Sequence, residues 1–182
     1  DSNNFYVTVG GSVLNTTTTV YTDIAPKNDV CFPAGTPVKT DQGFVNIQNL
    51  DAKKNTINGK RIIGVTCTKR KHDRYLVCFE KDSIDKNVPS ERTVMSAHHS
   101  VLYRGRLIYA SMLVDHDAVR FIEHTNTVLY NILMDEYETV EINGMICETL
   151  DPSHTIAKLF IEGLSQTKKE KIKSIKLYNL NN

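Results

Sequence analysis

The chain of 182 residues lacks the features that mark several functional classes. Its 22 Lys and Arg nearly balance 21 Asp and Glu, for a net charge of +1, so charge gives no reason to predict binding to nucleic acid or anionic membranes. No apolar run approaches the roughly 18 residues that a membrane-spanning helix requires. No glycine-rich phosphate loop occurs either. We therefore predict a globular protein with no membrane span, no nucleic-acid partner and no cofactor.

Paired cysteines are also missing. The four cysteines, none of them in a Cys-x-x-Cys pair, are Cys31, Cys67, Cys78 and Cys147. Structural zinc sites usually draw ligands from such pairs, so we predict no metal site. Cys67, Cys78 and Cys147 lie in apolar or alternating segments, which predicts buried thiols. A reactive Cys31 would have to stay reduced, which favours a reducing, cytoplasmic compartment.

What the chain has instead is apolar alternation with a period of two, and no long helical pattern in its centre. Four segments carry the alternation: Arg61–Thr68, Arg74–Phe79, Ala118–Ile122 and Val128–Leu133. A basic turn separates the first two segments and a polar turn the last two, so each pair is predicted to form a hairpin. Thr93–Ser96 follows one hairpin and Thr139–Ile142 follows the other, a faint internal duplication. The pattern predicts an all-β fold.

Three regions are predicted along the chain. Residues 1–30 form the tail of an upstream β-rich segment with a linker, residues 31–150 the central β domain, and residues 151–182 a C-terminal extension. The extension begins with Asp151-Pro152-Ser153, which can cap a helix. Apolar residues at helical spacing follow, and we expect them to pack on the β domain or on a partner. These residues are Ile156, Leu159, Phe160 and Leu164.

Cys31 opens the most informative block of the chain, which runs to Leu50 as CFPAGTPVKTDQGFVNIQNL. A cysteine ahead of a turn bent by glycine and proline, and then of a β-branched strand, can hold its sulfur beside its own peptide nitrogen. The block resembles the opening block of the Hint module, the self-processing fold of inteins, Hedgehog C-terminal domains and related bacterial and viral modules. The resemblance implies an all-β, pseudo-twofold Hint fold in which Cys31 attacks the Val30–Cys31 peptide bond.

The block Thr93–Tyr103 supplies the predicted acid. Within it, Ser96-Ala97-His98-His99 resembles the Thr-x-x-His or Ser-x-x-His motif of Hint modules. The resemblance implies that Ser96 hydrogen-bonds the scissile region and that His99 protonates the departing nitrogen, which an imidazole can do near neutral pH. His98 is the alternative acid. Neighbouring strand residues face opposite sides of a sheet, so we expect only one of the two histidines to reach the site.

A third block, from Tyr130 to Leu150, departs from the splicing members of this family. Asn131, a candidate catalytic residue, stands where the resemblance implies an aspartate, which removes an acid–base group. Glu148 and Thr149 stand where splicing needs a histidine and an asparagine. A threonine side chain cannot cyclise to a succinimide, so we predict no protein splicing. Cys147 could accept the acyl group or simply pack in the core.

Together these blocks predict an autoprocessing domain. Its substrate is the upstream polypeptide of the same chain, cut at the Val30–Cys31 bond through a thioester, with water, a thiol or another small nucleophile as acyl acceptor. Asn131 and Glu148 motivate an alternative, in which a catalytically weak or inactive Hint fold serves as a structural or interaction module of a larger protein. A cysteine peptidase acting on other chains is a third hypothesis. The composition, rich in Lys and Asn, resembles viral or protist versions of the module more than Hedgehog proteins.

Overall fold

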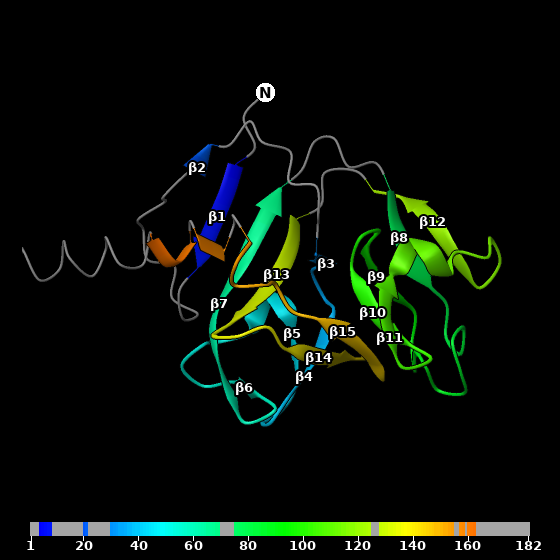
Figure 1. Cartoon of the computed structure of the whole chain (residues 1–182), viewed down its shortest axis with the longest axis horizontal. Helices are drawn as coiled ribbons and strands as arrows, with labels where there is room; N and C mark the ends of the chain where they lie inside the picture. The colour runs from blue at the N-terminus through cyan, green and yellow to red at the C-terminus, as the bar shows by residue number, and fades with distance from the viewer. Residues whose placement is uncertain are drawn as a thin grey trace, which may run out of the picture.

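The computed structural model describes residues 4–8, 20–21, 30–69, 75–124, 128–154, 157–158 and 160–162, with the backbone alone for 4–8, 20–21 and 68–69. Its strands form three sheets, ordered β2-β1-β7-β13-β3 with β6 beside β7, β11-β10-β15-β14-β4-β5, and β12-β8-β9 (Figure 1). The all-β prediction is confirmed. The elements are β1 (Asn4–Thr8), β2 (Val20–Tyr21), β3 (Phe32–Pro33), β4 (Pro37–Thr40), β5 (Gly43–Asn46), η1 (Ile47–Asn49), β6 (Thr56–Ile57), β7 (Lys60–Lys69), β8 (Tyr75–Phe79), β9 (Thr93–Ser96), β10 (Ser100–Tyr103), β11 (Arg106–Tyr109), η2 (Ala110–Leu113), β12 (Val119–Glu123), β13 (Val128–Met134), β14 (Thr139–Ile142) and β15 (Met145–Glu148).

The two expected hairpins do not form, so this part of the prediction was wrong. β7 pairs with β13 and β1 rather than with β8, and β8 pairs with β12 and β9. The two predicted hairpins therefore exchange strands. Alternation identifies a strand and its buried face, but it does not select the neighbour, because every strand offers the same backbone donors and acceptors. The expected turns, residues 70–74 and 125–127, lie outside the described residues.

The pairing of β7 with β13 contains a bulge that divides the side chains between two faces. The register shifts between Leu133 and Met134, which leaves Ile63 as an extra residue in β7. As a result, Ile62 and Val65 both pack in the large core, whereas Ile63 packs against a small cluster on the other face. The first sheet thus has a large core on one side and smaller apolar clusters on the other.

β3 joins this first sheet to the third one. Figure 1 shows it between β13 and β9. Phe32–Pro33 pairs with β13, and one residue earlier the backbone of Cys31 hydrogen-bonds to Ser96 of β9. Successive residues of a strand direct their backbone groups to opposite edges, so Phe32 faces β13 while Cys31 faces β9. The predicted nucleophile therefore lies where two sheets meet.

A helical segment covers one of the small clusters. Residues 157–158 and 160–162 have helical backbone, and the N–H of Lys158 donates to the carbonyl of His154 at 3.0 Å. The Phe160 ring is buried against Gly64, where an added Cβ would lie 2.3 Å from Phe160 Cζ. Glycine at position 64 therefore provides the space that the ring fills. The rest of the predicted stripe, Ile156, Leu159 and Leu164, lies outside the described residues.

The cysteines lie in the interior of the protein. All four cysteines are buried and none forms a disulfide, as predicted for Cys67, Cys78 and Cys147. Within the described residues, no helix has the length and apolar character needed to cross a membrane.

Candidate active site

Ser96 hydrogen-bonds to both backbone polar groups of Cys31. The Cys31 N–H, which belongs to the Val30–Cys31 bond, donates to Ser96 Oγ at 2.9 Å. The Ser96 N–H donates to the Cys31 carbonyl, also at 2.9 Å. Cys31 is 2% exposed and Ser96 4% exposed, so neither bond competes with bulk water. Because a hydroxyl rotates, Ser96 Oγ can accept from the amide and later donate to the same nitrogen as an amine.

His99 is buried beside the backbone of Cys31. Its Nε2 is 3.0 Å from the carbonyl oxygen of Glu148, and its ring centroid is 4.1 Å from that of Phe32. A carbonyl oxygen only accepts, so Nε2 carries the proton and Nδ1 of the neutral ring carries the lone pair. Within the described residues, Nδ1 has no hydrogen-bond partner. The neutral ring therefore presents an unused basic nitrogen.

The electrostatic environment keeps His99 neutral. Burial lowers its pKa from 6.5 to about 4, and the backbone carbonyls of Glu148 and Cys31 oppose that effect only in part. At neutral pH the imidazole has no spare proton to donate. Acid catalysis by His99 consequently requires that it first accept a proton, which a base with a free lone pair can do.

The two adjacent histidines have different environments. His98 is exposed and meets the Tyr109 ring edge-on, with centroids 5.6 Å apart, whereas His99 is 1% exposed. Strand alternation is not the cause, because both residues lie after the end of β9 and before β10, where the chain turns. That detail of the prediction was wrong. The turn, closed by the His99 N–H donating to the Ser96 carbonyl at 3.1 Å, directs His99 inward.

Asn131 lies in one row with Cys31. β13 pairs with β3 at Tyr130↔Phe32, and continuing this antiparallel register by one residue places Asn131 opposite Cys31. Leu129, two residues from Asn131 on the same face, packs against Cys31. On its other side, Asn131 pairs with Thr66 of β7.

Thr66 is a site residue that the sequence analysis missed. It is 2% exposed, and Thr66 Oγ1 and Asn131 Oδ1 both lack a hydrogen-bond partner in the part of the chain that the structure describes. Threonine is common in strands and mostly unremarkable there. Its position opposite Asn131 depends on the β7–β13 pairing, which no local pattern predicts.

Glu148 contributes to the site through its backbone and its side chain. Its carbonyl accepts from His99, and its carboxylate accepts the Ser100 N–H at 2.8 Å and lies 3.4 Å from Tyr137 Oη. The carboxylate therefore anchors the first residue of β10, directly after His99. Glu148 is placed to orient the histidine rather than to touch the Val30–Cys31 bond.

Cys147 and Thr149 are bound into the surrounding structure. Thr149 donates both its N–H and its Oγ1–H to the carbonyl of Glu138, each at 2.9 Å. Cys147 is 0% exposed, and burial together with the charge of Glu148 raises its thiol pKa. A protonated, enclosed thiol is a poor acyl acceptor.

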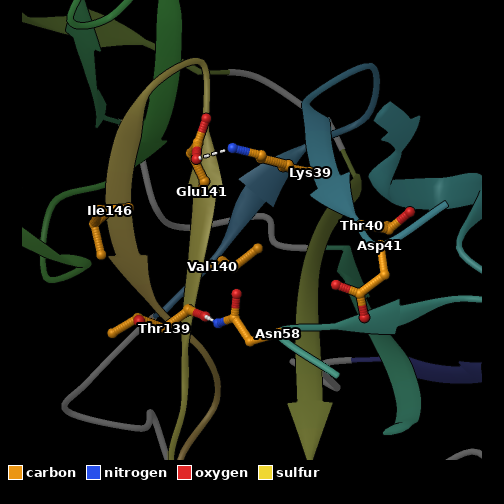
Figure 2. Close-up of a pocket in the computed structure, with 8 residues that line it drawn as sticks. All are labelled: Lys39, Thr40, Asp41, Asn58, Thr139, Val140, Glu141 and Ile146. Carbon is orange, nitrogen blue, oxygen red and sulfur yellow. Dashed lines mark hydrogen bonds and ion pairs between the residues drawn. The ribbon is translucent and has the colours of Figure 1, made fainter. Parts of the chain in front are cut away.

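A groove on the outer face of the second sheet lies apart from these residues. It has a volume of about 120 Å³ and is crossed by the Lys39–Glu141 ion pair at 2.6 Å and by the Asn58 side chain, which donates to the Thr139 carbonyl (Figure 2). None of the predicted site residues lines it. The described residues also contain no cluster of three His, Cys, Asp or Glu side chains that could hold a metal ion.

One comparison with known proteins identifies the family of the fold. Residues 30–154 match the family model of the Hint domain. The chain belongs to the Hint domain family. Searches of curated proteins and of solved structures found no match. In this Hint domain the matched region includes Cys31, Ser96 and His99 and ends before the helical residues 157–158 and 160–162. Family membership makes autoprocessing the activity to test.

Proposed function

We propose that this Hint domain cleaves its own chain at the Val30–Cys31 bond through an N–S acyl shift. The observation that carries the proposal is the pair of 2.9 Å hydrogen bonds between Cys31 and Ser96, with His99 buried beside them. These contacts fix the scissile nitrogen against a rotatable hydroxyl and near a neutral imidazole. Positioning of this kind is what an intramolecular attack requires.

The proposed step begins when the Cys31 Sγ attacks the Val30 carbonyl carbon. Nδ1 of His99 accepts the thiol proton, and the imidazolium then returns it to the departing nitrogen as the C–N bond breaks and the C–S bond forms. The Nε2 bond to Glu148 holds the ring in the tautomer that this sequence needs. The products are a thioester at Val30 and a free amine at Cys31. Water then releases the upstream polypeptide as a carboxylate and restores the thiol.

Burial of Cys31 favours self-processing over cleavage of other chains. A nucleophile that is 2% exposed cannot meet a foreign peptide, whereas the preceding residue of its own chain is already in place. Thr149 cannot cyclise and is tied to Glu138, so we propose that no segment after the β domain is released and no splicing follows.

The test is cleavage by neutral hydroxylamine, which attacks thioesters and leaves ordinary amides intact. The wild-type protein should yield a fragment ending at Val30, and Cys31→Ala should yield none while keeping its fold. Cys147→Ala is the matched control, because it also removes a buried thiol but should cleave at the wild-type rate. If wild-type protein remains whole after prolonged treatment, the cleavage proposal is wrong and a structural role for the Hint fold is favoured.

A further inference from the structure

Three consecutive positions across the first sheet place a polar pair beside the nucleophile. Thr66 of β7, Asn131 of β13 and Cys31, the residue before β3, lie in one cross-strand row. Neighbouring strands lie about 4.8 Å apart, so the side chains of one row on one face are adjacent. The clusters confirm the shared face: Cys31 packs with Leu129, whereas Val65 packs in the large core on the opposite face.

The polar atoms of this row are unusual for buried groups. Many buried polar side chains bond within the chain, for example Asn143 to Thr93 at 2.9 Å. Thr66 Oγ1 and Asn131 Oδ1 have no such partner among the described residues, although both residues are 2% exposed. Leaving a buried polar atom unsatisfied costs roughly 1–3 kcal/mol, so a pair of them on one row calls for a ligand.

The surroundings limit the size of that ligand. On this face, Leu129 and Leu76 pack against Cys31. Leu133 and Phe160 form a separate cluster, in which the Phe160 ring lies against Gly64. Gly64 precedes Thr66 by two residues and therefore lies on the same face. The row is a polar strip between two apolar clusters. Water is the smallest molecule that can bond to both polar atoms at once.

We propose that Thr66 and Asn131 seat the water molecule that hydrolyses the Cys31 thioester. This inference rests on the proposed function and names the residues that position its acyl acceptor. Asn131 Oδ1 accepts a hydrogen bond from the water, and Thr66 Oγ1 forms a second one, which together orient the water oxygen toward the row of Cys31. The oxygen bonds to the Val30 carbonyl carbon, the C–S bond breaks, and the water proton passes to the thiolate. The products are the Val30 carboxylic acid and the Cys31 thiol.

Loss of the proposed water site should slow thioester hydrolysis and leave thioester formation unchanged. Thr66→Val keeps the shape of the side chain and removes the hydroxyl. Thioester is quantified by acid quenching and mass spectrometry, and hydrolysis by incorporation of heavy oxygen from labelled water into the fragment ending at Val30. We expect hydrolysis to slow about tenfold and thioester to accumulate, as the loss of one orienting hydrogen bond predicts. Thr40→Val, which alters a buried strand threonine in the second sheet, should leave both quantities unchanged.

A stability measurement tests the seat independently of catalysis. If Thr66 Oγ1 is hydrogen-bonded to a bound water, Thr66→Val should lower the melting temperature. The substitution leaves the water, and Asn131 Oδ1 beside it, with one hydrogen-bond partner fewer. If the hydroxyl has no ligand at all, valine removes an unsatisfied group and the melting temperature should rise, which would overturn the proposal. Hydrolysis at the wild-type rate in Thr66→Val would overturn it as well. A wild-type protein that forms no thioester would refute the proposed function, and this inference with it.

Discussion

Acidification from pH 7 to pH 5 should destabilise this Hint domain, with His99 as a main cause. The pKa of His99 is about 4 in the folded protein and near 6.5 in an unfolded chain, because burial disfavours the imidazolium. Below pH 6.5 the unfolded state therefore binds a proton that the folded state excludes. Stability from His99 is complete above pH 6.5 and is lost as the pH falls toward 4.

The magnitude follows from the two pKa values. The full difference corresponds to about 3 kcal/mol, and about 2 kcal/mol of it should be lost between pH 7 and pH 5. Exposed carboxylates such as Asp41 and Glu80, whose pKa values are lowered by hydrogen bonds from Thr56 and Arg120, lose their stabilising effect mainly below this range. Between pH 7 and pH 5, histidine protonation therefore accounts for most of the change in the free energy of unfolding.

Urea unfolding of wild type and of His99→Gln at both pH values isolates the effect. Glutamine can still donate to the Glu148 carbonyl but does not titrate, so its stability should fall by about 2 kcal/mol less than that of wild type. Burial also lowers the pKa of His154. Because His154 is present in both proteins, its contribution to the pH dependence of stability cancels in the comparison. His98→Gln is the matched control, because it makes the same substitution at the exposed neighbour. Equal pH dependence in wild type and His99→Gln would refute the description of His99 as a buried neutral base.

Three further predictions concern the surrounding structure. Ser96→Ala should leave the buried Cys31 N–H without an acceptor, cost about 1–3 kcal/mol in urea unfolding and slow cleavage at least tenfold. Gly64→Ala should cost about 1–3 kcal/mol in the same measurement, because the new methyl group would lie 2.3 Å from Phe160 Cζ, and unchanged stability would contradict the packing described here. After cleavage, the upstream fragment should co-elute with the rest of the protein on gel filtration and separate in urea, because β1 pairs with β7 over five residues.

The sequence was informative where function depends on local spacing. Cys31 and the Ser96–His99 motif could be identified from residue types alone, because a nucleophile, a hydroxyl and an imidazole at these positions resemble a known block. The burial of His99 was expected, but its cause was not, since a turn rather than a strand separates it from His98. Local motifs name the residues of a site without fixing the backbone that presents them.

Long-range pairing was the part that could not be predicted. The strands at 60–69 and 128–134 were both recognised, yet nothing in either pattern indicates that they pair with each other. Thr66 became a site residue only through that pairing, and the fit of Phe160 on Gly64 joins segments nearly a hundred residues apart. Both depend on which strands pair, and backbone hydrogen bonds form in the same way whatever the side chains are.

Mass spectrometry of the upstream fragment after hydroxylamine treatment tests the central claim most directly. If the Val30–Cys31 bond passes through a thioester, the wild-type fragment should end at Val30 with a hydroxamate at its C-terminus, and the complementary fragment should begin with an unmodified Cys31. Cys31→Ala should give neither fragment. A single species at 20.6 kDa in the wild-type sample, or fragments that begin at any other residue, would contradict the account.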